Sequence, residues 1–477
     1  MLPKNNLEQK LHVQIATSGI MDNAIQLWLK MYKNTPDWLG GAAHVKSLNL
    51  AAGIAEEMAR LVLTEFDIEI EGSERANFIK EQLQGTLDNM GNIVEMYCAL
   101  GGIVLKPYAA GADEVTGEPD HIEIDVVHAN RFYPTAFDSN KDVTGAVFVD
   151  TKRIGDYVYT RLEHHSLVGT HYTVINKAFR SERLNTMETE DDWYINVKQP
   201  FMQEISLEQV DDWKGIDPVV ELDDIEKPFF VYVKNPRANN IDPHSPLGAS
   251  VFARARESIQ DADEQYSRII WEYEAKEAAI DADETLFTTD RRGNPILPKG
   301  KERLYRTYDT GGGAGEKAGF ITPYSPEIRD ESMFNGLSKI YRNIEFQCGL
   351  AYGTISDAPG ASAVERTATE IKNSKQRSYR TVHAMQTAWD DGIEKLMYVL
   401  NAICDLYELV PDGAVEKTVT WGDGVLEDTD VEYLRRWNMV MAGKMKLEKF
   451  YAWYFGCSEE QALEYIPQQA PQFPEEE

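Results

Sequence analysis

The residues best suited to chemistry in this chain are acids in short runs, which could hold a hard cation between carboxylates. Because the chain carries 79 Asp and Glu residues, such runs arise by chance, and solvated turns or helix ends explain them better. Two adjacent histidines, His164 and His165, fall on a predicted strand, where neighbouring side chains point to opposite faces and do not easily share one metal. We therefore predict no metal site and no cofactor. The acidic runs are Asp211-Asp212, Asp223-Asp224 and Asp281-Ala282-Asp283-Glu284.

Three glycine-containing stretches are similar to catalytic motifs but lack essential residues. The glycine-rich run at 311–318 contains Lys317, but Glu316 precedes it and Ala318 follows it, so the Gly-Lys-Ser/Thr of a phosphate-binding loop is absent. The stretches 248–252 and 360–364 have a Gly-x-Ser start without the final glycine of a nucleophile elbow. We predict no catalytic residues and no enzyme. A carboxylate-dependent hydrolase that uses the acidic runs remains the alternative from another class.

Composition limits the partners of this 477-residue chain. Its formal net charge of −31 repels phosphates, which argues against tight non-specific binding of nucleic acid by a single subunit. The four cysteines have no paired spacing, so we expect free thiols in a reduced, intracellular setting. We see no signal peptide at the start and no apolar run long enough to cross a bilayer, and we expect a soluble protein assembled in the cytoplasm. The cysteines are Cys98, Cys348, Cys404 and Cys457.

Two long amphipathic helices are the elements around which the chain is organised. The first is predicted from Ser245, as N-cap, and Pro246 to about Ile280, roughly 50 Å at 1.5 Å per residue. Its apolar stripe runs from Val251 to Tyr273 in steps of three and four. The opposite stripe is mostly acidic: Glu257, Asp261, Glu264, Arg268 and Glu272.

The second helix is predicted to start at Ser325-Pro326 and to stop at Gly349, with an apolar stripe from Met333 to Cys348. A basic, glycine-rich segment separates the two helices. A hairpin of this kind has little core of its own, so we expect its apolar stripes to need neighbours. The basic residues are Arg291, Arg292, Lys299, Lys301, Arg303, Arg306 and Lys317.

The rest of the chain predicts an α+β fold. Helices are expected at 25–32, 48–63 and 76–98, then an antiparallel meander with strands at 103–105, 122–127, 146–150, 157–164, 171–176 and 193–197, and a further short strand at 229–233. A Gly/Ser/Pro loop at 352–362 leads into a very long helix at 363–409, followed by a strand at 415–425 and short helices to 465. The loop residues of interest are Gly353, Thr354, Ser356, Asp357, Gly360 and Ser362. The long helix starts with Arg366, Lys372, Lys375 and Arg377.

The ordered set of motifs resembles the portal proteins of long-tailed bacteriophages of Gram-positive hosts, over nearly the whole chain. The matching stretches lie at the positions that the family leads us to expect. Helix, tip, helix, loop and long kinked helix also follow one another in the family's order. The stretches are Ile25–Trp38, Leu100-Gly101-Gly102 with Lys106, Asp125–Pro134, Phe229–Phe252 and Thr367-Ala368-Thr369-Glu370.

The resemblance implies a ring, usually of twelve subunits, at one capsid vertex of the virion, with double-stranded DNA passing through without sequence specificity. It also implies partners: the terminase large subunit, a head-completion adaptor, and the major capsid and scaffolding proteins, with no membrane. It assigns residues 1–240 to a wing, 241–284 to a first stem helix, 285–322 to a clip and 323–349 to a second stem helix. Residues 350–362 become a tunnel loop, 363–426 a long kinked helix and wing strand, and 427–477 a short helical crown and tail.

The same resemblance suggests roles, and each has a plainer alternative. The acidic stripe would line the channel, or else pair with basic side chains of a neighbouring stem helix, for example Asp261 with Arg268 of the adjacent helix. The basic clip would dock a partner or steady DNA, or else be a solvated turn. Gly353 and Gly360 would be hinges of the tunnel loop, and the basic start of the long helix would contact phosphates or pair with wing acids. A scaffold or adaptor that docks by a coiled coil, with no channel, remains the other alternative.

Overall fold

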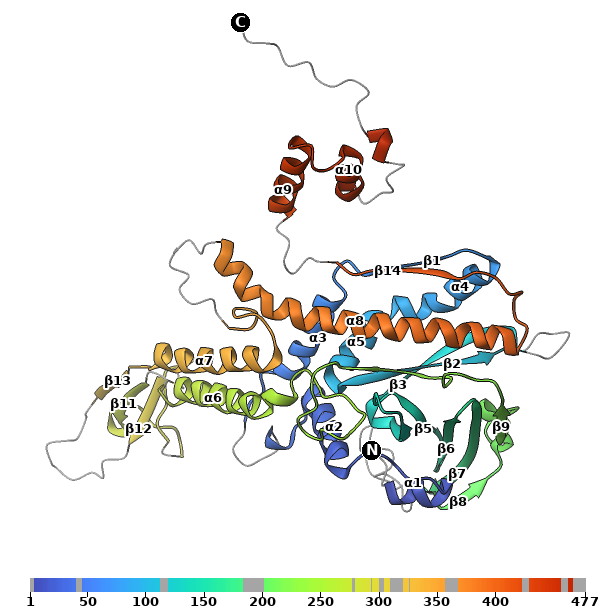
Figure 1. Cartoon of the computed structure of the whole chain (residues 1–477). Helices are drawn as coiled ribbons and strands as arrows, with labels where there is room; N and C mark the ends of the chain where they lie inside the picture. The colour runs from blue at the N-terminus through green and yellow to red at the C-terminus, as the bar shows by residue number, and fades with distance from the viewer. Residues whose placement is uncertain are drawn as a thin grey trace, which may run out of the picture.

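The computed structural model describes residues 4–39, 45–111, 119–182, 201–276, 279–292, 294–299, 304–308, 321–325, 327–356, 368–422, 429–455 and 462–465. The fold is α+β, as predicted: helices and small antiparallel sheets share one body, from which a two-helix hairpin projects (Figure 1). No helix among these residues combines the length and apolarity needed to cross a membrane.

The N-terminal helices form one side of the body. They are α1 Lys4–Leu11, α2 Gly19–Tyr32, α3 Leu50–Val62, α4 Glu74–Asp88 and α5 Met90–Leu100. The single helix predicted at 76–98 is wrong, because Asn89 leaves helical geometry (φ −97°, ψ 8°) and divides it into α4 and α5. Gly101 ends α5 with φ +82°, a conformation that favours glycine. The buried faces of α2 to α5 join one large hydrophobic core.

Two antiparallel sheets complete this part of the body, and they confirm the predicted meander. In the first, β2 Gly102–Ala110 lies between β10 Val231–Lys234 and β3 His121–His128. The second runs β4 Phe132–Phe137, β5 Val143–Ile154, β6 Tyr157–Val168, β7 His171–Glu182 and β8 Gln203–Ile205, and β9 Val219–Leu222 also pairs with β7. The strand predicted at 193–197 lies outside the described residues. Short 3-10 helices are η1 Asp37–Leu39, η2 Ala129–Arg131, η3 Leu207–Gln209, η4 Asp211–Trp213, η5 Ala253–Ala255, η6 Glu284–Leu286 and η8 Leu463–Tyr465.

The projecting hairpin consists of α6 Arg256–Ala275 and α7 Asp330–Cys348. At its far end lies a three-stranded tip sheet of β11 Ala279–Asp283, β12 Tyr305–Tyr308 and β13 Ile321–Tyr324 (Figure 1). The central strand β11 is parallel to β12 and antiparallel to β13. Sequence periodicity did not predict these strands, since each is only four or five residues long.

The predicted start of the first long helix at Ser245 is wrong, because α6 starts eleven residues later at Arg256. Ser245 instead accepts a hydrogen bond from the backbone of Leu247 (3.1 Å) in a local turn. The next residue, Gly248, packs directly on the backbone of Gly101: a Cβ at Gly248 would lie 2.0 Å from the Gly101 carbonyl oxygen. The segment is therefore a wedge in the core, and α6 spans about 30 Å rather than 50 Å.

The long helix α8 Ala368–Leu406 crosses the body (Figure 1). It is bent near its N-terminal end, and the sequence predicted a kinked helix here. It contacts α3, β2 and β10. The turn that follows α8 is held by Arg75, which is only 3% exposed. The Arg75 guanidinium donates to the carbonyls of Val410 (2.9 Å) and Pro411 (3.1 Å). Then β14 Glu416–Thr420 returns to pair antiparallel with β1 Asp67–Glu71. The last helices, α9 Thr429–Met441 and α10 Leu447–Phe455, pack together through aromatic side chains such as Phe450.

The close contact between the backbones of Gly101 and Gly248 predicts how substitution changes the stability of the chain. Gly248→Ala forces the Gly101 and Gly248 backbones apart and should lower the free energy of unfolding by about 3 kcal/mol. Gly85→Ala is the matched control: Gly85 lies in α4 with open space around it, so alanine should stabilise by up to about 1 kcal/mol. Denaturant unfolding measures both, and equal stabilities for the two variants would contradict a close contact between the two glycines.

Candidate functional site

The hairpin has a fixed register between its two helices. Asn343 on α7 donates to Ser258 on α6 (2.9 Å), and Arg329 binds Glu272 through both carboxylate oxygens (3.1 and 3.0 Å). Between these contacts Gln265 lies beside Gly336. The contacts step by seven residues along α6 and by seven in the opposite direction along α7, the spacing of a coiled-coil seam. The hairpin is therefore a defined antiparallel pair rather than two loosely adjacent rods.

The predicted apolar stripes face each other and the body. Ile259 and Ile269 of α6 and Leu337 and Ile344 of α7 are at most 3% exposed, and they belong to the main core. The expectation that these stripes need neighbouring subunits to cover them is therefore wrong, because one chain already covers most of each stripe. Large apolar residues outside the stripes are exposed on the hairpin, together with Tyr273 at the end of the first stripe: Trp271 (65%), Phe346 (57%), Phe334 (46%), Ile328 (41%) and Tyr273 (37%).

The acidic stripe of α6 divides into two kinds of residue. Glu257 and Asp261 are exposed, and partly exposed Glu264 pairs with exposed Arg268 of the same helix (3.5 Å). The predicted fifth member, Glu272, is instead buried in an ion pair with Arg329 and Lys276 (2.6 Å). Hydrogen bonds from Arg329 and Lys276 lower the pKa of Glu272 to about 2. An outward acidic face therefore extends from Glu257 to Glu264 and ends at Arg268.

Asp263, next to this stripe, points toward the body. Its carboxylate accepts from the indole of Trp38 (3.0 Å) and from the backbone of Leu48 (2.8 Å). Burial raises the pKa of this carboxyl group, and both hydrogen bonds oppose the shift. The contact fastens the base of α6 to the segment that follows α2.

After α7 the chain forms a tight turn around the side chain of Glu345, which is fully buried. One oxygen, Oε1, accepts the backbone N–H groups of Gly353 (3.1 Å), Ile355 (2.7 Å) and Ser356 (2.9 Å). The other, Oε2, accepts the hydroxyl of Ser356 (2.9 Å). We call residues 350–356 the loop base. Of the predicted loop residues, Gly353, Thr354 and Ser356 lie in the loop base, and Asp357, Gly360 and Ser362 lie outside the described residues.

The start of α8 packs against the loop base. Ser378 accepts from the backbone of Ala351 (2.6 Å), and Thr381 donates to the carbonyl of Gly349 (3.2 Å). Arg377, predicted as a phosphate contact, lies over the rings of Phe346 (4.5 Å) and Tyr352 (5.1 Å). Lys372 and Lys375 belong to the first turns of α8, and Arg366 lies outside the described residues.

Arg237 holds the end of α7 from the other side. It donates to the carbonyls of Gln347 (2.6 Å) and Cys348 (2.9 Å), and to that of Val251 (2.7 Å) just before α6. Burial lowers its pKa. Sequence reasoning missed both Arg237 and Glu345. For Glu345 a signal existed, since it is a charged residue beside the apolar positions Ile344 and Cys348. For Arg237 we find no signal.

The tip contains two kinds of basic residue. Arg306 pairs with Asp281 (3.1 Å) and stacks on Tyr324 (4.2 Å), so it joins β12 to β11 and β13. Arg291, Arg292 and Lys299 are exposed, the first two at a turn in which Asp290 accepts from the Arg292 backbone (2.7 Å). Lys301, Arg303 and Lys317 lie outside the described residues. Four of the predicted docking cations are thus exposed, and one of them, Arg306, is also held by Asp281 and Tyr324.

Acids in these runs pair with Lys or His side chains. Asp211 pairs with Lys214 (2.5 Å), Asp212 with Lys152 (2.5 Å) and Asp223 with His171 (2.9 Å). In the described part of the chain, no group of three or more His, Cys, Asp or Glu side chains is placed to hold a metal ion. His164 and His165 have separate partners, Thr135 for the first and Glu163 and Tyr172 for the second, as expected for opposite faces.

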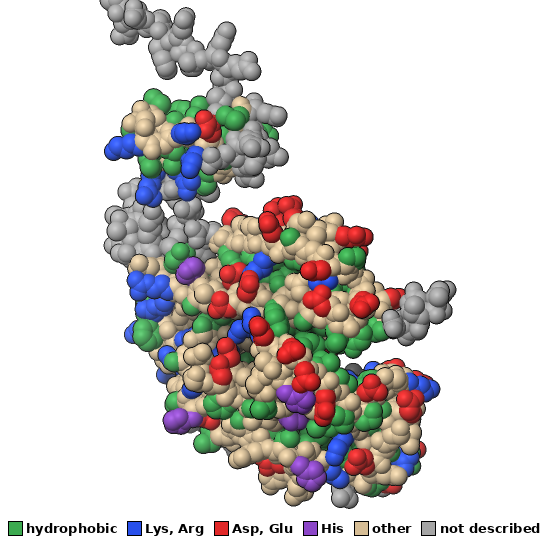
Figure 2. Space-filling view, turned by 45° about the vertical axis from the view of Figure 1, so that its right-hand side comes forward, with side chains coloured by type: hydrophobic (Ala, Val, Ile, Leu, Met, Phe, Trp, Pro, Cys, Tyr) green, Lys and Arg blue, Asp and Glu red, His purple; other side chains and the backbone are tan. Residues whose placement is uncertain are grey.

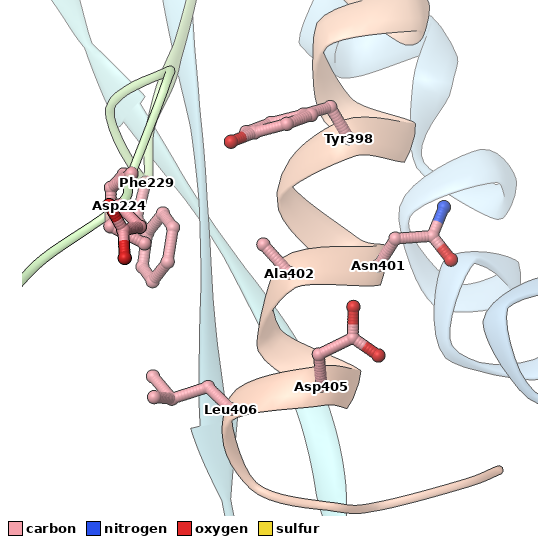
Figure 3. Close-up of a pocket in the computed structure, with 8 residues that line it drawn as sticks. Asp224, Phe229, Tyr398, Asn401, Ala402, Asp405 and Leu406 are labelled. Carbon is pink, nitrogen blue, oxygen red and sulfur yellow. The ribbon is translucent and has the colours of Figure 1, made fainter. Parts of the chain in front are cut away.

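The surface also has a groove of about 430 Å³ away from the hairpin. Tyr398, Ala402 and Leu406 of α8 form one wall, and Asp224 and Phe229 of the connector before β10 form the other (Figure 3). Figure 2 shows acids spread over one face of the body, with one group of Lys and Arg at its left edge and others elsewhere on that face. The groove mixes acidic and apolar groups, and Asp224 from the acidic run 223–224 is one of its lining residues.

Comparison with known proteins gives limited information. No family model matches the chain, and no curated protein matches it. A chain of the structure described as "Neck of native GTA particle computed with C12 symmetry" is 12% identical, with a TM-score of 0.40 over 86% of this chain and 90% of that chain. A chain of "Virion of native gene transfer agent (GTA) particle" is 11% identical, with a TM-score of 0.42 over 94% of this chain and 95% of that chain. Neither similarity is close enough to assign a function.

The ion pair in the hairpin predicts acid sensitivity. The pKa of Glu272 falls from an ordinary value of 4.5 to about 2 in the folded chain. The carboxylate therefore stabilises the hairpin above about pH 4.5, and this contribution is lost as the pH falls toward 2. Glu272→Gln should abolish this part of the pH dependence, so the variant and the wild type should converge in stability as the pH falls.

Thermal unfolding between pH 6 and pH 2.5 measures the effect of Glu272. Glu331→Gln, an exposed acid on α7, is the matched control and should follow the wild type. Parallel curves for wild type and Glu272→Gln would show that the pair with Arg329 has no role in stability.

Proposed function

We propose that this chain is a phage portal protein: a ring-forming, non-enzymatic subunit at a capsid vertex that surrounds the DNA channel. Support comes from the order of motifs in the sequence and from the elements found in that order: α6, tip sheet, α7, loop base, α8 and the returning strand β14. The observation that carries the proposal is the projecting hairpin, which presents acids on one face and large apolar side chains on others.

The exposed acids supply a mechanism for a channel wall. Glu257, Asp261 and Glu264 lie on one side of α6 and repeat in every subunit of a ring. A negative wall repels DNA phosphates over a Debye length of about 8 Å at physiological salt. In this proposal the duplex stays centred and slides without binding tightly, which suits a conduit that reads no sequence.

The exposed apolar residues supply contacts between subunits. Trp271, Phe334 and Phe346 would each contribute roughly 1.5–3 kcal/mol if a neighbouring hairpin buried them completely. These contacts are separate from the inner stripes, which the chain covers by itself. In the ring, the outer faces of one hairpin would meet those of the next.

The tip is the proposed docking surface. Arg291, Arg292 and Lys299 form an exposed cationic set at the end of the hairpin and could attract an acidic face of the terminase large subunit or of a head-completion adaptor. Capsid and scaffolding proteins would meet the wing. Asp211, Asp212 and Asp281 pair with Lys or Arg side chains, which argues against their use by the hydrolase alternative. A channel-free scaffold protein would form small oligomers rather than rings.

Electron microscopy of the purified protein tests the proposal. We expect rings near twelve subunits with a central hole, and we expect Trp271→Glu with Phe334→Glu to prevent ring formation while each subunit stays folded. Val168→Glu is the control, since Val168, the last residue of β6 in the body, is even more exposed (73%) than Trp271 and Phe334. A stable dimer without a hole, at all concentrations, would favour the scaffold alternative and overturn the proposal.

Charge reversal tests the channel wall. Glu257→Lys with Asp261→Lys adds positive charge where phosphates would pass, so packaging should slow several-fold at low salt and recover as salt screens the attraction. Asp156→Lys with Glu221→Lys is the control, because it changes the net charge equally at exposed positions of the body, in the turn between β5 and β6 and in β9. Single-particle packaging velocity is the measurement, and equal velocities for both double variants at low salt would show that this face does not line the channel.

A further inference from the structure

The loop base is built around one buried carboxylate. Glu345 is fully buried, and its two oxygens accept three backbone N–H groups and one hydroxyl, all from Gly353 to Ser356. A charged carboxylate is costly to bury unless hydrogen bonds replace its water. Here the loop supplies all four of these donors, and hydrogen bonds to a charged acceptor are the stronger kind. The turn and the carboxylate therefore stabilise each other.

The contacts around this carboxylate connect the loop base to both neighbouring helices. Glu345 belongs to the last turn of α7, whose end is closed by Gly349 with φ +81°. On the other side, Ser378 of α8 binds the backbone of Ala351 and Arg377 stacks on Tyr352. The hydroxyl of Thr354 donates back to the carbonyl of Ala351 (2.8 Å). Residues 351 to 356 are thus held at their start, middle and end.

We infer that Glu345 is the positioning residue of this loop: it latches residues 353–356 to α7, so that the loop base moves together with α7. Gly353, predicted from sequence as a hinge, is one of the latched residues. Its φ of +91° serves the turn around the carboxylate. The meaning of the latch for a channel rests on the proposed function, because there a tilt of α7 would carry the loop toward or away from the duplex.

Amide hydrogen exchange on the full chain tests the latch directly. In Glu345→Ala the amides of Gly353, Ile355 and Ser356 lose their acceptor, and we expect them to exchange at least about tenfold faster than in the wild type. Glu345→Gln keeps the size and one oxygen but loses the charge, so it should give a smaller increase. Glu331→Ala, an exposed acid on the same helix, is the control and should leave these amides unchanged.

Chemical rescue separates a latch from a general loss of structure. Formate can occupy the space left in Glu345→Ala and accept the same N–H groups. Added formate should slow the exchange of these three amides in Glu345→Ala, whereas chloride at equal ionic strength should not. Exchange at the wild-type rate in Glu345→Ala, or fast exchange that formate does not slow, overturns the inference. Should Glu345→Ala not fold, Glu345→Gln decides: wild-type rates at these amides overturn the latch.

The result of the hydrogen-exchange experiment does not depend on whether the subunits assemble into a ring. All contacts of the latch lie within one chain, so exchange can be measured on the protein whether or not it assembles. If rings form but Glu345→Ala does not speed amide exchange, the proposed function stands and the latch is refuted. If Glu345→Ala speeds amide exchange but no rings form, the latch stands and the proposed function is refuted.

Discussion

The end of α7 is the constraint on which the rest of the hairpin depends. The last carbonyl groups of a helix have no helical N–H partners, and they carry the negative end of its dipole. Arg237 satisfies two of them and the carbonyl of Val251 as well. Because one guanidinium binds both the end of α7 and the entry to α6, the two helices leave the body at a fixed relative position.

The same helix end also positions the next segment of the chain. Within five residues α7 supplies Glu345 to the loop base, the carbonyls of Gln347 and Cys348 to Arg237, and Gly349 to the turn against Thr381. Farther along, the seven-residue steps between Ser258, Gln265 and Glu272 lock α6 onto α7. The hairpin, the loop base and the start of α8 are thus joined at one point and have little freedom to move separately.

The sequence predicted what local periodicity controls. Stripes with a 3.6-residue period identified α6 and α7, and alternation identified β2, β3 and β5 to β7. The start of α6 could not be predicted, because it depends on the close approach of Gly101 and Gly248, which are far apart in sequence. The division at Asn89 and the short tip strands also lacked a periodic signal. In the site, the exposed acids Glu257 and Asp261 followed from helix geometry, whereas the burial of Glu272 depends on Arg329 of the other helix.

The pairing of β1 with β14 has a consequence for synthesis. The two strands lie about 350 residues apart along the chain, so at typical translation speeds β1 waits roughly 20–70 s for its partner to leave the ribosome. During that interval Ile70, which is 2% exposed in the folded chain, lies on an open strand edge that other chains can join. The nascent N-terminal half therefore exposes an apolar strand residue that the folded chain covers.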